Sequence, residues 1–354
     1  MFKPLSERQE QILGLLVQTY VETGLPVGSK TLVERFVLDI SPATVRHELA
    51  ALDEAGYVTQ IHTSGGRIPT EFGYRYFVQR LLRDFELPVT EQQMIRHQFH
   101  QARTEMEQWM RLAAAILART SQGASLVTAP RPRQNRFKHL ELISTQGRLV
   151  LLILVLFGGE VKQQMLTLAE PASQARLSQA AERLNALLEG LSLGDLQARL
   201  GQLSGLEEDI ARLVLDVIQR ADERGLNSFY HDGLLNLLND ESTRQAVRVL
   251  EERTLLSMVL AEMLETAGAG VQVVIGGEGR WAALKDCALI LSRYGVNGEL
   301  SGEVAVLGPT RMPYGRNISA VRYVADLMSG FVHEYYVNEP LLSLEDPRHS
   351  QAEL

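Results

Sequence analysis

Polar and basic residues in the first fifth of the chain have the composition of a nucleic-acid contact. Thr44, Arg46 and His47 follow Ser41 within seven residues. Arginine can pair with guanine through two parallel hydrogen bonds, whereas threonine or histidine can contact a base or a phosphate. Ser41 followed by Pro42 is typical of a helix start, where the free N–H groups favour a phosphate. The cluster therefore predicts a helix that reads DNA with its outer face.

A second cluster lies about twenty residues later. It contains His62, Thr63, Ser64 and Arg67 around the pair Gly65–Gly66. Backbone N–H groups at glycines can approach a phosphate without obstruction by Cβ. We expect these residues to form a loop on DNA, with Arg67 reaching the minor groove or the phosphate backbone.

Three short helices and a hairpin must position both clusters. Apolar periodicity and capping residues predict helices after Ser6, Ser29 and Ser41, ended at Gly24 and Gly56 in the first and third cases. Residues 57–61 and 67–68 have strand character on either side of the glycine turn. This order predicts a winged helix, in which the third helix enters the major groove. The stripe of Val45, Leu49 and Leu52 should face inward, leaving Arg46 and His47 outside.

Net charge has to be judged by segment. The chain carries −8 overall, but residues 1–83 contain nine Lys/Arg and nine Asp/Glu. Between residues 58 and 83, Glu71 is the one acidic residue against four arginines. A neutral head with a basic hairpin inside an acidic chain is compatible with DNA binding.

The rest of the chain alternates between strand and helix patterns. Helices are expected at about 71–85, 90–119 and 318–336, and a helical block at about 171–253. Strands are expected at 137–145, 149–157, 161–168, 271–275, 288–292 and 303–307. Strands, a helical block and strands again predict an α+β domain interrupted by a helical insertion.

Composition favours a soluble globular protein of the cytoplasm. Apolar residues make up 45% of the chain, and the longest uninterrupted apolar run is the nine-residue Leu149–Phe157. A membrane helix needs about 20 such residues. Cys287 is the single cysteine, so no internal disulfide forms, which fits a reducing compartment. Met1–Glu7 has no apolar stretch of signal-peptide length. We expect a cytoplasmic protein with no membrane contact, associated with the nucleoid when bound to DNA.

Other chemistry is poorly supported. Gly276–Arg280 lacks the glycine spacing of a dinucleotide site and any Gly-Lys-Ser/Thr, so a tight turn is the better interpretation. His97 and His100 lie three residues apart without further metal ligands, and Cys287 shows no nucleophile signature. We therefore expect no enzyme activity, no cofactor and no metal.

Five segments together resemble one known family. They are 41–50 (Ser-Pro-Ala-Thr-Val-Arg-His-Glu-Leu-Ala), Gly56-Tyr57, 62–70 (His-Thr-Ser-Gly-Gly-Arg-Ile-Pro-Thr) with Gly73–Phe77, Ile275–Glu278 and Gly308–Tyr314. Their combination resembles the HrcA family of heat-inducible transcription repressors over nearly the whole chain. The resemblance implies a winged helix at 1–85, a GAF-like domain at 86–170 and 250–340, and an inserted dimerisation domain at 171–249.

The same resemblance implies the partners. They are double-stranded DNA with an inverted-repeat operator upstream of chaperone operons, a second copy of the chain, and the chaperonin that keeps the repressor active. Two departures stand out: His47 replaces a usual Asn on the reading face, and 236–241 replaces a usual Pro-Glu-Phe ending. Imidazole can replace one amide hydrogen bond but not a bidentate pair, so the operator base at this position is left open.

Two other classes of function compete with chaperonin-dependent repression. In the first, the GAF-like domain binds a small molecule and controls a winged-helix regulator. In the second, the three-helix head is a protein-interaction module that does not bind DNA. Footprinting on promoters tests the second, and thermal-shift screening against metabolites and chaperonin tests the first.

Overall fold

A computed structural model describes most of the chain. The described residues are 2, 4–61, 65–82, 85–102, 105–132, 134–223, 229–238, 270–276, 284–296 and 300–337. They form two compact units, one of residues 1–129, 229–295 and 302–354 and one of residues 130–228 and 296–301. We call these the first and the second unit.

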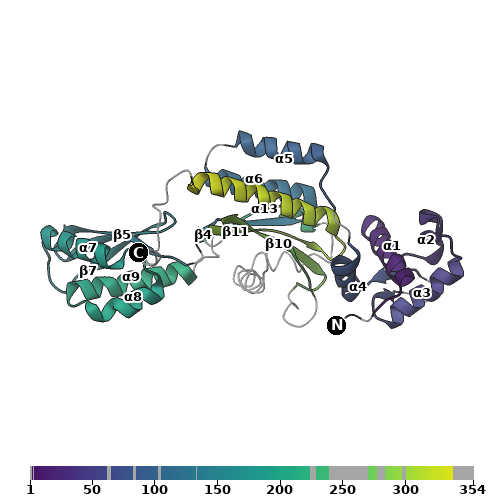
Figure 1. Ribbon diagram of the computed structural model, residues 1–354, viewed down its shortest axis with the longest axis horizontal. Helices are drawn as coiled ribbons and strands as arrows, with labels where there is room; N and C mark the ends of the chain where they lie inside the picture. Colours follow the sequence, from purple (N-terminus) through teal and green to yellow (C-terminus); the bar gives the residue numbers. More distant parts are fainter. Residues whose placement is uncertain are drawn as a thin grey trace, which may run out of the picture. The chain divides into compact units, whose positions relative to one another are not determined.

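The first unit begins with a winged-helix domain, here called the head (residues 4–82). Its elements are α1 (Glu7–Thr23), α2 (Ser29–Phe36), α3 (Pro42–Glu54), β1 (Val58–Gln60), β2 (Arg67–Pro69) and α4 (Glu71–Tyr76), followed by a π-helical turn over Phe77–Leu81. Ser6 and Gln9 form the predicted capping box, and Gly24 ends α1 in the left-handed conformation with φ 68°. The predicted three helices and hairpin are confirmed (Figure 1).

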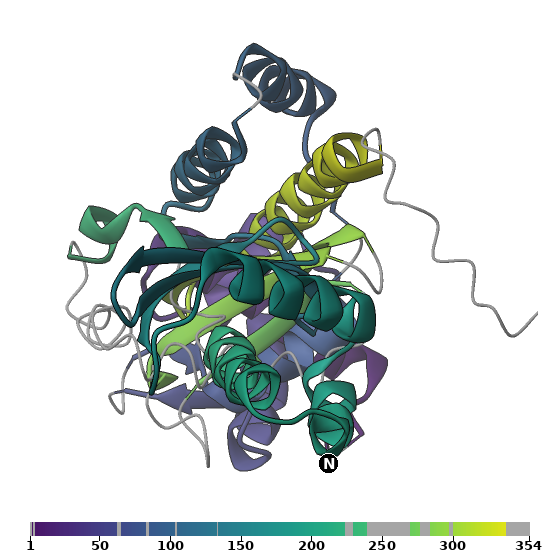
Figure 2. The same ribbon diagram turned by 90° about the vertical axis from the view of Figure 1, so that its left-hand side faces the viewer.

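The rest of the first unit, here called the body, is an antiparallel sheet with helices on one face. The strands run in the order β8 (Phe229–Asp232), β3 (Ala124–Thr128), β11 (Leu300–Pro309), β10 (Cys287–Val296) and β9 (Gln272–Ile275). The short β4 (Arg131–Pro132) pairs with Leu300 and Ser301 at the start of β11, and these four residues belong to the second unit. Helices α6 (Met106–Ser121) and α13 (Tyr314–Val337) lie side by side over this sheet, as Figures 1 and 2 show. The short α10 (Leu234–Leu238) follows β8.

The helix expected at 90–119 is instead two helices, α5 (Val89–Gln101) and α6. The rings of Phe99 and Trp109 both stack on Phe331 of α13, at centroid distances of 5.6 and 5.2 Å. Ten residues of straight helix would separate the two rings by about 15 Å. A break between them lets both aromatic residues pack on the same partner, which the local helical pattern does not reveal.

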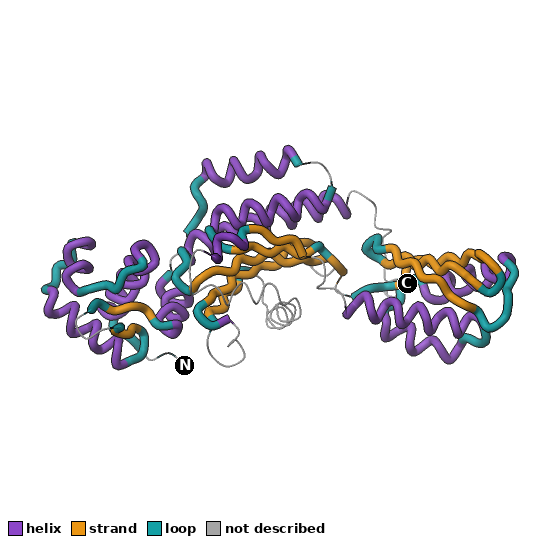
Figure 3. Tube along the Cα trace, turned by 180° about the vertical axis from the view of Figure 1, so that it is seen from behind, coloured by secondary structure: helices purple, strands orange, loops and turns teal. Residues whose placement is uncertain are grey.

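The second unit is a three-stranded sheet with helices on one face (Figure 3). Strands β5 (Phe137–Gln146), β6 (Leu149–Leu156) and β7 (Val161–Thr167) are antiparallel in sequence order. The helices are α7 (Gln174–Leu188), α8 (Leu193–Arg199) with a 3₁₀ turn at Leu200–Gln202, and α9 (Leu206–Glu223). Alternate strand residues such as Leu152 and Leu154 form a buried core with Leu177, Leu184 and Ile210 of these helices.

These boundaries differ from those expected from the sequence. The unit begins at 130 rather than 171, because the strands expected at 137–168 pack on α7 and α9 and pair only with one another among the described strands. The second unit therefore contains a sheet as well as the helices α7, α8 and α9 predicted after residue 171. The expected span 250–269 of the GAF-like domain and 239–249 of the insertion lie outside the described residues.

No described helix is long and apolar enough to cross a membrane. Within the same residues, no group of three or more His, Cys, Asp and Glu side chains is placed to hold a metal ion.

Candidate nucleic-acid interface

Helix α3 has one buried face and one open face, as the apolar stripe predicts. Val45, Leu49 and Leu52 are at most 1% exposed and pack inside the head. Arg46 and His47 are exposed on the opposite side. Side chains that pack inside the head cannot also enter a DNA groove. Arg46 and His47 can therefore contact bases, whereas the buried stripe cannot.

The N-terminus of α3 is fixed by a side-chain cap. The hydroxyl oxygen of Ser41 accepts a hydrogen bond from the Thr44 N–H at 3.1 Å, and the two hydroxyl groups lie 3.0 Å apart. Pro42 follows at the first helical position. The structure therefore uses Ser41 and Thr44 to shape the helix start, where free N–H groups can also donate hydrogen bonds to a phosphate.

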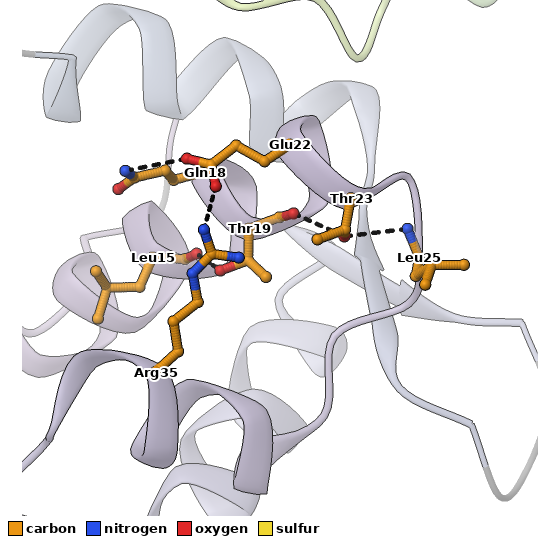
Figure 4. A network of polar contacts seen from close by, with 7 residues as sticks. All are labelled: Leu15, Gln18, Thr19, Glu22, Thr23, Leu25 and Arg35. Atoms are coloured by element: carbon orange, nitrogen blue, oxygen red, sulfur yellow. Dashed lines mark hydrogen bonds and ion pairs between the residues drawn. The ribbon is translucent and has the colours of Figure 1, made fainter.

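A polar network fixes α2 against α1 (Figure 4). The hydroxyls of Thr19 and Thr23 each donate 2.8 Å hydrogen bonds to carbonyl groups one turn earlier, and the N–H of Leu25 donates to the Thr23 hydroxyl. Arg35 of α2 pairs with Glu22 of α1. The guanidinium of Arg35 thus has a partner on α1 within the head.

The hairpin is tied to both ends of the helix-turn-helix through Arg67. The N–H and carbonyl of Arg67 exchange 2.9 Å hydrogen bonds with those of Val27 in the loop before α2. Its side chain is 16% exposed and donates from Nε to Oδ2 of Asp53, near the end of α3, at 3.1 Å. A Cβ on Gly66 would lie 2.6 Å from the backbone of Val27, so this close approach requires glycine. Arg67 therefore has an intramolecular partner that holds the wing, and its contact with the minor groove or the phosphate backbone stays a prediction.

Ile68-Pro69-Thr70, part of one of the family-like segments, closes the base of the hairpin. The Thr70 hydroxyl donates to the Gly56 carbonyl at 2.7 Å and accepts from the Gly73 N–H at 3.1 Å, which caps α4. Beside it the Tyr76 hydroxyl donates to Glu10 of α1. Burial, together with this hydrogen bond, raises the pKa of Tyr76 to about 12. These residues hold the fold and need not touch DNA.

Two acidic residues near the open face lie close to arginines within the head. Glu48 lies 3.6 Å from Arg8 of α1, and Asp53 is paired with Arg67. Lys30, exposed at the first turn of α2, adds a cation that sequence reasoning missed. Positively charged residues at this position suit phosphate contacts. His62, Thr63 and Ser64, predicted to contact DNA, lie outside the described residues.

Sequence reasoning also missed the partner of Arg67. Asp53 is fourteen residues away, and no periodicity relates a helix end to a strand start across a hairpin. A signal did exist in the two charges of opposite sign that flank the hairpin, but it does not distinguish an intramolecular pair from a DNA contact.

A winged helix with a capped, outward-facing third helix, joined to an α+β body, defines a class: DNA-binding transcription regulators. Comparison with known proteins agrees. Residues 2–65 match the LexA DNA binding domain model, and residues 107–318 match the model described as HrcA protein C terminal domain.

Curated relatives span the whole chain. The chain is 45% identical over 350 residues to a "Heat-inducible transcription repressor HrcA" of Roseiflexus castenholzii, covering 95% of this chain and 97% of the relative. It is 44% identical over 349 residues to the protein of that name from Herpetosiphon aurantiacus, covering 95% and 98%. A crystal structure described as a hypothetical protein is 26% identical with a TM-score of 0.55, covering 93% and 98%.

The chain belongs to the HrcA family of heat-inducible transcription repressors, which are regulators and not enzymes.

Proposed function

We propose that this protein represses chaperone operons by binding an inverted-repeat operator as a dimer, and that heat releases the repression. The observation that carries the proposal is the open face of α3, where Arg46 and His47 are exposed beside a capped helix start. The printed names of the curated relatives, heat-inducible transcription repressors, support a regulated gene of the heat response. A repressor of this kind acts where the chromosome lies, so we assign it to the cytoplasm.

The proposed DNA contacts are of two kinds: contacts to base edges, which read the sequence, and contacts to phosphates, which position the protein. We assign Arg46 to a guanine edge and His47 to a single hydrogen bond with a neighbouring base. We assign the α3 start at Ser41 and Thr44, together with Lys30, to phosphates, because these groups fix register without reading sequence. His62, Thr63 and Ser64 remain predicted phosphate contacts.

Footprinting with the full chain on the chaperone-operon promoters of its own genome tests the proposal. The expected result is protection of two half-sites related by a two-fold axis, at centres one helical turn or a multiple apart. Protection elsewhere in the genome but not there would contradict the choice of operon. Absence of protection on any DNA would favour the protein-interaction alternative.

We assign dimerisation to the second unit, but to its sheet and not to its helices. The apolar faces of α7 and α9 are occupied by the shared core. The opposite face of the sheet is open and carries an apolar strip: Ile143, Val161 and Met165 are 41–53% exposed, and Leu151, between Ile143 and Met165 in register, is half-buried. Two exposed polar residues, Glu141 and Gln163, lie on the same face beside Ile153. A polar face would be expected if water covered it. A second copy of the same sheet is the occupant that symmetry favours.

This face alone is small for a stable dimer. Three strands about 4.8 Å apart and about 24 Å long present roughly 300 Å² per copy. A stable interface buries about 800 Å² per partner. The body therefore contributes the remainder in our proposal, which links dimer geometry to the head.

The dimer is tested by light scattering on Met165→Glu and Val161→Glu. Both variants should shift the chain to monomer, because each places a charge in an apolar contact. The matched control is Leu25→Glu, which is 67% exposed in the head, outside both surfaces assigned to the dimer, and should leave the dimer intact. A dimer that survives both sheet substitutions would refute the assignment.

Heat release depends on the chaperonin in our proposal. Chaperonin should raise the fraction of chain that binds the operator after heating, as measured by gel shift. In the alternative, the GAF-like domain senses a small-molecule ligand and controls a winged-helix regulator. Strong thermal stabilisation by one metabolite, with none by chaperonin, would favour that alternative.

A further inference from the structure

The head meets the body through α4, at a contact we call the joint: Tyr74 and Arg75 on the head, and Ile275, Gly276 and Tyr314 on the body. Arg75 donates from Nε and Nη2 to the Ile275 carbonyl at 3.3 and 3.1 Å, and from Nη2 to the Gly276 carbonyl at 3.4 Å. The Tyr74 and Tyr314 rings lie 5.8 Å apart. The two C-terminal segments that resemble family signatures are thus where the head is held.

The carbonyl groups that Arg75 binds are rigidly placed. They lie at the end of β9, the last strand of the described sheet. The Gly276 N–H donates to the Cys287 carbonyl at 2.9 Å, and a Cβ on Gly276 would lie 1.8 Å from the Leu284 carbonyl oxygen. A planar guanidinium that donates to two fixed carbonyls restrains direction as well as distance, which a lysine ammonium does not.

Apolar packing at the joint is less complete. A hollow of about 210 Å³ lies beside it, lined in part by Val78, Leu82 and Phe85 from the end of the head and the segment after it, and by Val273 and Ile318 of the body. The buried Tyr74 hydroxyl has no hydrogen-bond partner within the described residues. Loose apolar contact limits separation but does not fix an angle. The directional hydrogen bonds of Arg75 can supply it, together with the guanidinium of Arg311, which lies beside Gly24 at the end of α1.

We propose that Arg75 is a positioning residue that sets the angle of the reading head on the body. This inference rests on the proposed function, in which a dimer reads two half-sites. Such a dimer can bind both half-sites only if their spacing matches the positions of its two heads, because one added base pair turns a half-site by about 34–36° around the DNA axis. A head fixed by Arg75 accepts one spacing, whereas a head that pivots accepts several.

The experiment measures spacing preference with the full chain. Sequences are selected from a random inverted-repeat library with spacers of several lengths, and the winning half-site is then tested at each spacer. For the wild type we expect affinity to fall at least about ten-fold when the spacer changes by two base pairs. For Arg75→Lys and Arg75→Gln we expect a fall of less than about three-fold, with affinity for a single half-site within about two-fold of wild type.

Three variants separate the effect of the hydrogen bonds from that of charge and from that of packing. Arg75→Lys keeps the charge, and Arg80→Gln removes a neighbouring exposed charge outside the joint. Tyr74→Phe removes the hydroxyl without a partner and should keep the narrow preference. A wild-type spacing profile in folded Arg75→Lys would overturn the inference. Failure of the wild type to select any inverted repeat would instead refute the proposed function.

Discussion

The pair of Arg67 and Asp53 makes the sharpest prediction about how the wing is built. Its side chains are 16% and 32% exposed, and Nε lies 3.1 Å from Oδ2. Fully exposed pairs contribute about 0.2–1 kcal/mol, and breaking a buried pair costs about 3–5 kcal/mol. For this half-buried pair we expect Asp53→Asn to lower the free energy of unfolding of the head by about 1 kcal/mol, at the upper end of the range for exposed pairs.

Urea denaturation measures this loss. Glu54→Gln is the matched control, because it removes the adjacent exposed charge near the same helix end without contacting Arg67 in any described hydrogen bond or ion pair. A double-mutant cycle with Arg67→Gln should give a coupling of about 0.5–1 kcal/mol. Additive effects of the two substitutions would refute the pairing.

DNA binding separates the structural role from a direct contact. If Arg67 only positions the wing, Arg67→Gln weakens operator binding but leaves the dependence of log K on log salt unchanged. If Arg67 binds a phosphate, as the sequence predicts, the slope falls by about 0.9 for each site. A slope lowered by that amount would show that Arg67 leaves Asp53 when DNA binds.

Arg46→Ala should cost about 1–3 kcal/mol of specific binding and relax base preference in gel-shift competition; unchanged discrimination would contradict its assignment. Val37 has φ 49° and is 87% exposed, so Val37→Gly should stabilise the head by up to about 1 kcal/mol in urea denaturation. Because the pKa of Tyr76 is raised to about 12, its contribution to stability is complete below pH 10 and lost as pH rises from 10 to 12; Tyr76→Phe should flatten thermal stability over that window. Asn185 bonds both the N–H and the carbonyl of Leu140 at 2.8 and 3.0 Å, so Asn185→Ala should destabilise the second unit by about 1–3 kcal/mol in guanidinium.

The sequence by itself determined the head. Caps, helix periodicity and turn glycines are local signals, because each is carried by residues within a few positions of one another. Ser41, the stripe of Val45, Leu49 and Leu52, and the glycine turn sufficed to predict the three helices, the hairpin and the exposed face of α3. The family motifs extended this local interpretation to the class of regulator.

The tertiary structure alone decided which strands share a sheet and which charges are free. The strand pattern of β5–β7 is the same whether its apolar residues meet the body or α7 and α9, so the unit boundary at 130 could not be read locally. Arg67 and Arg75 are of a residue type that commonly contacts DNA. Their hydrogen-bond partners within the chain nevertheless lie 14 and 200 residues away. Pairings over such separations depend on how elements pack, which no spacing in the sequence records.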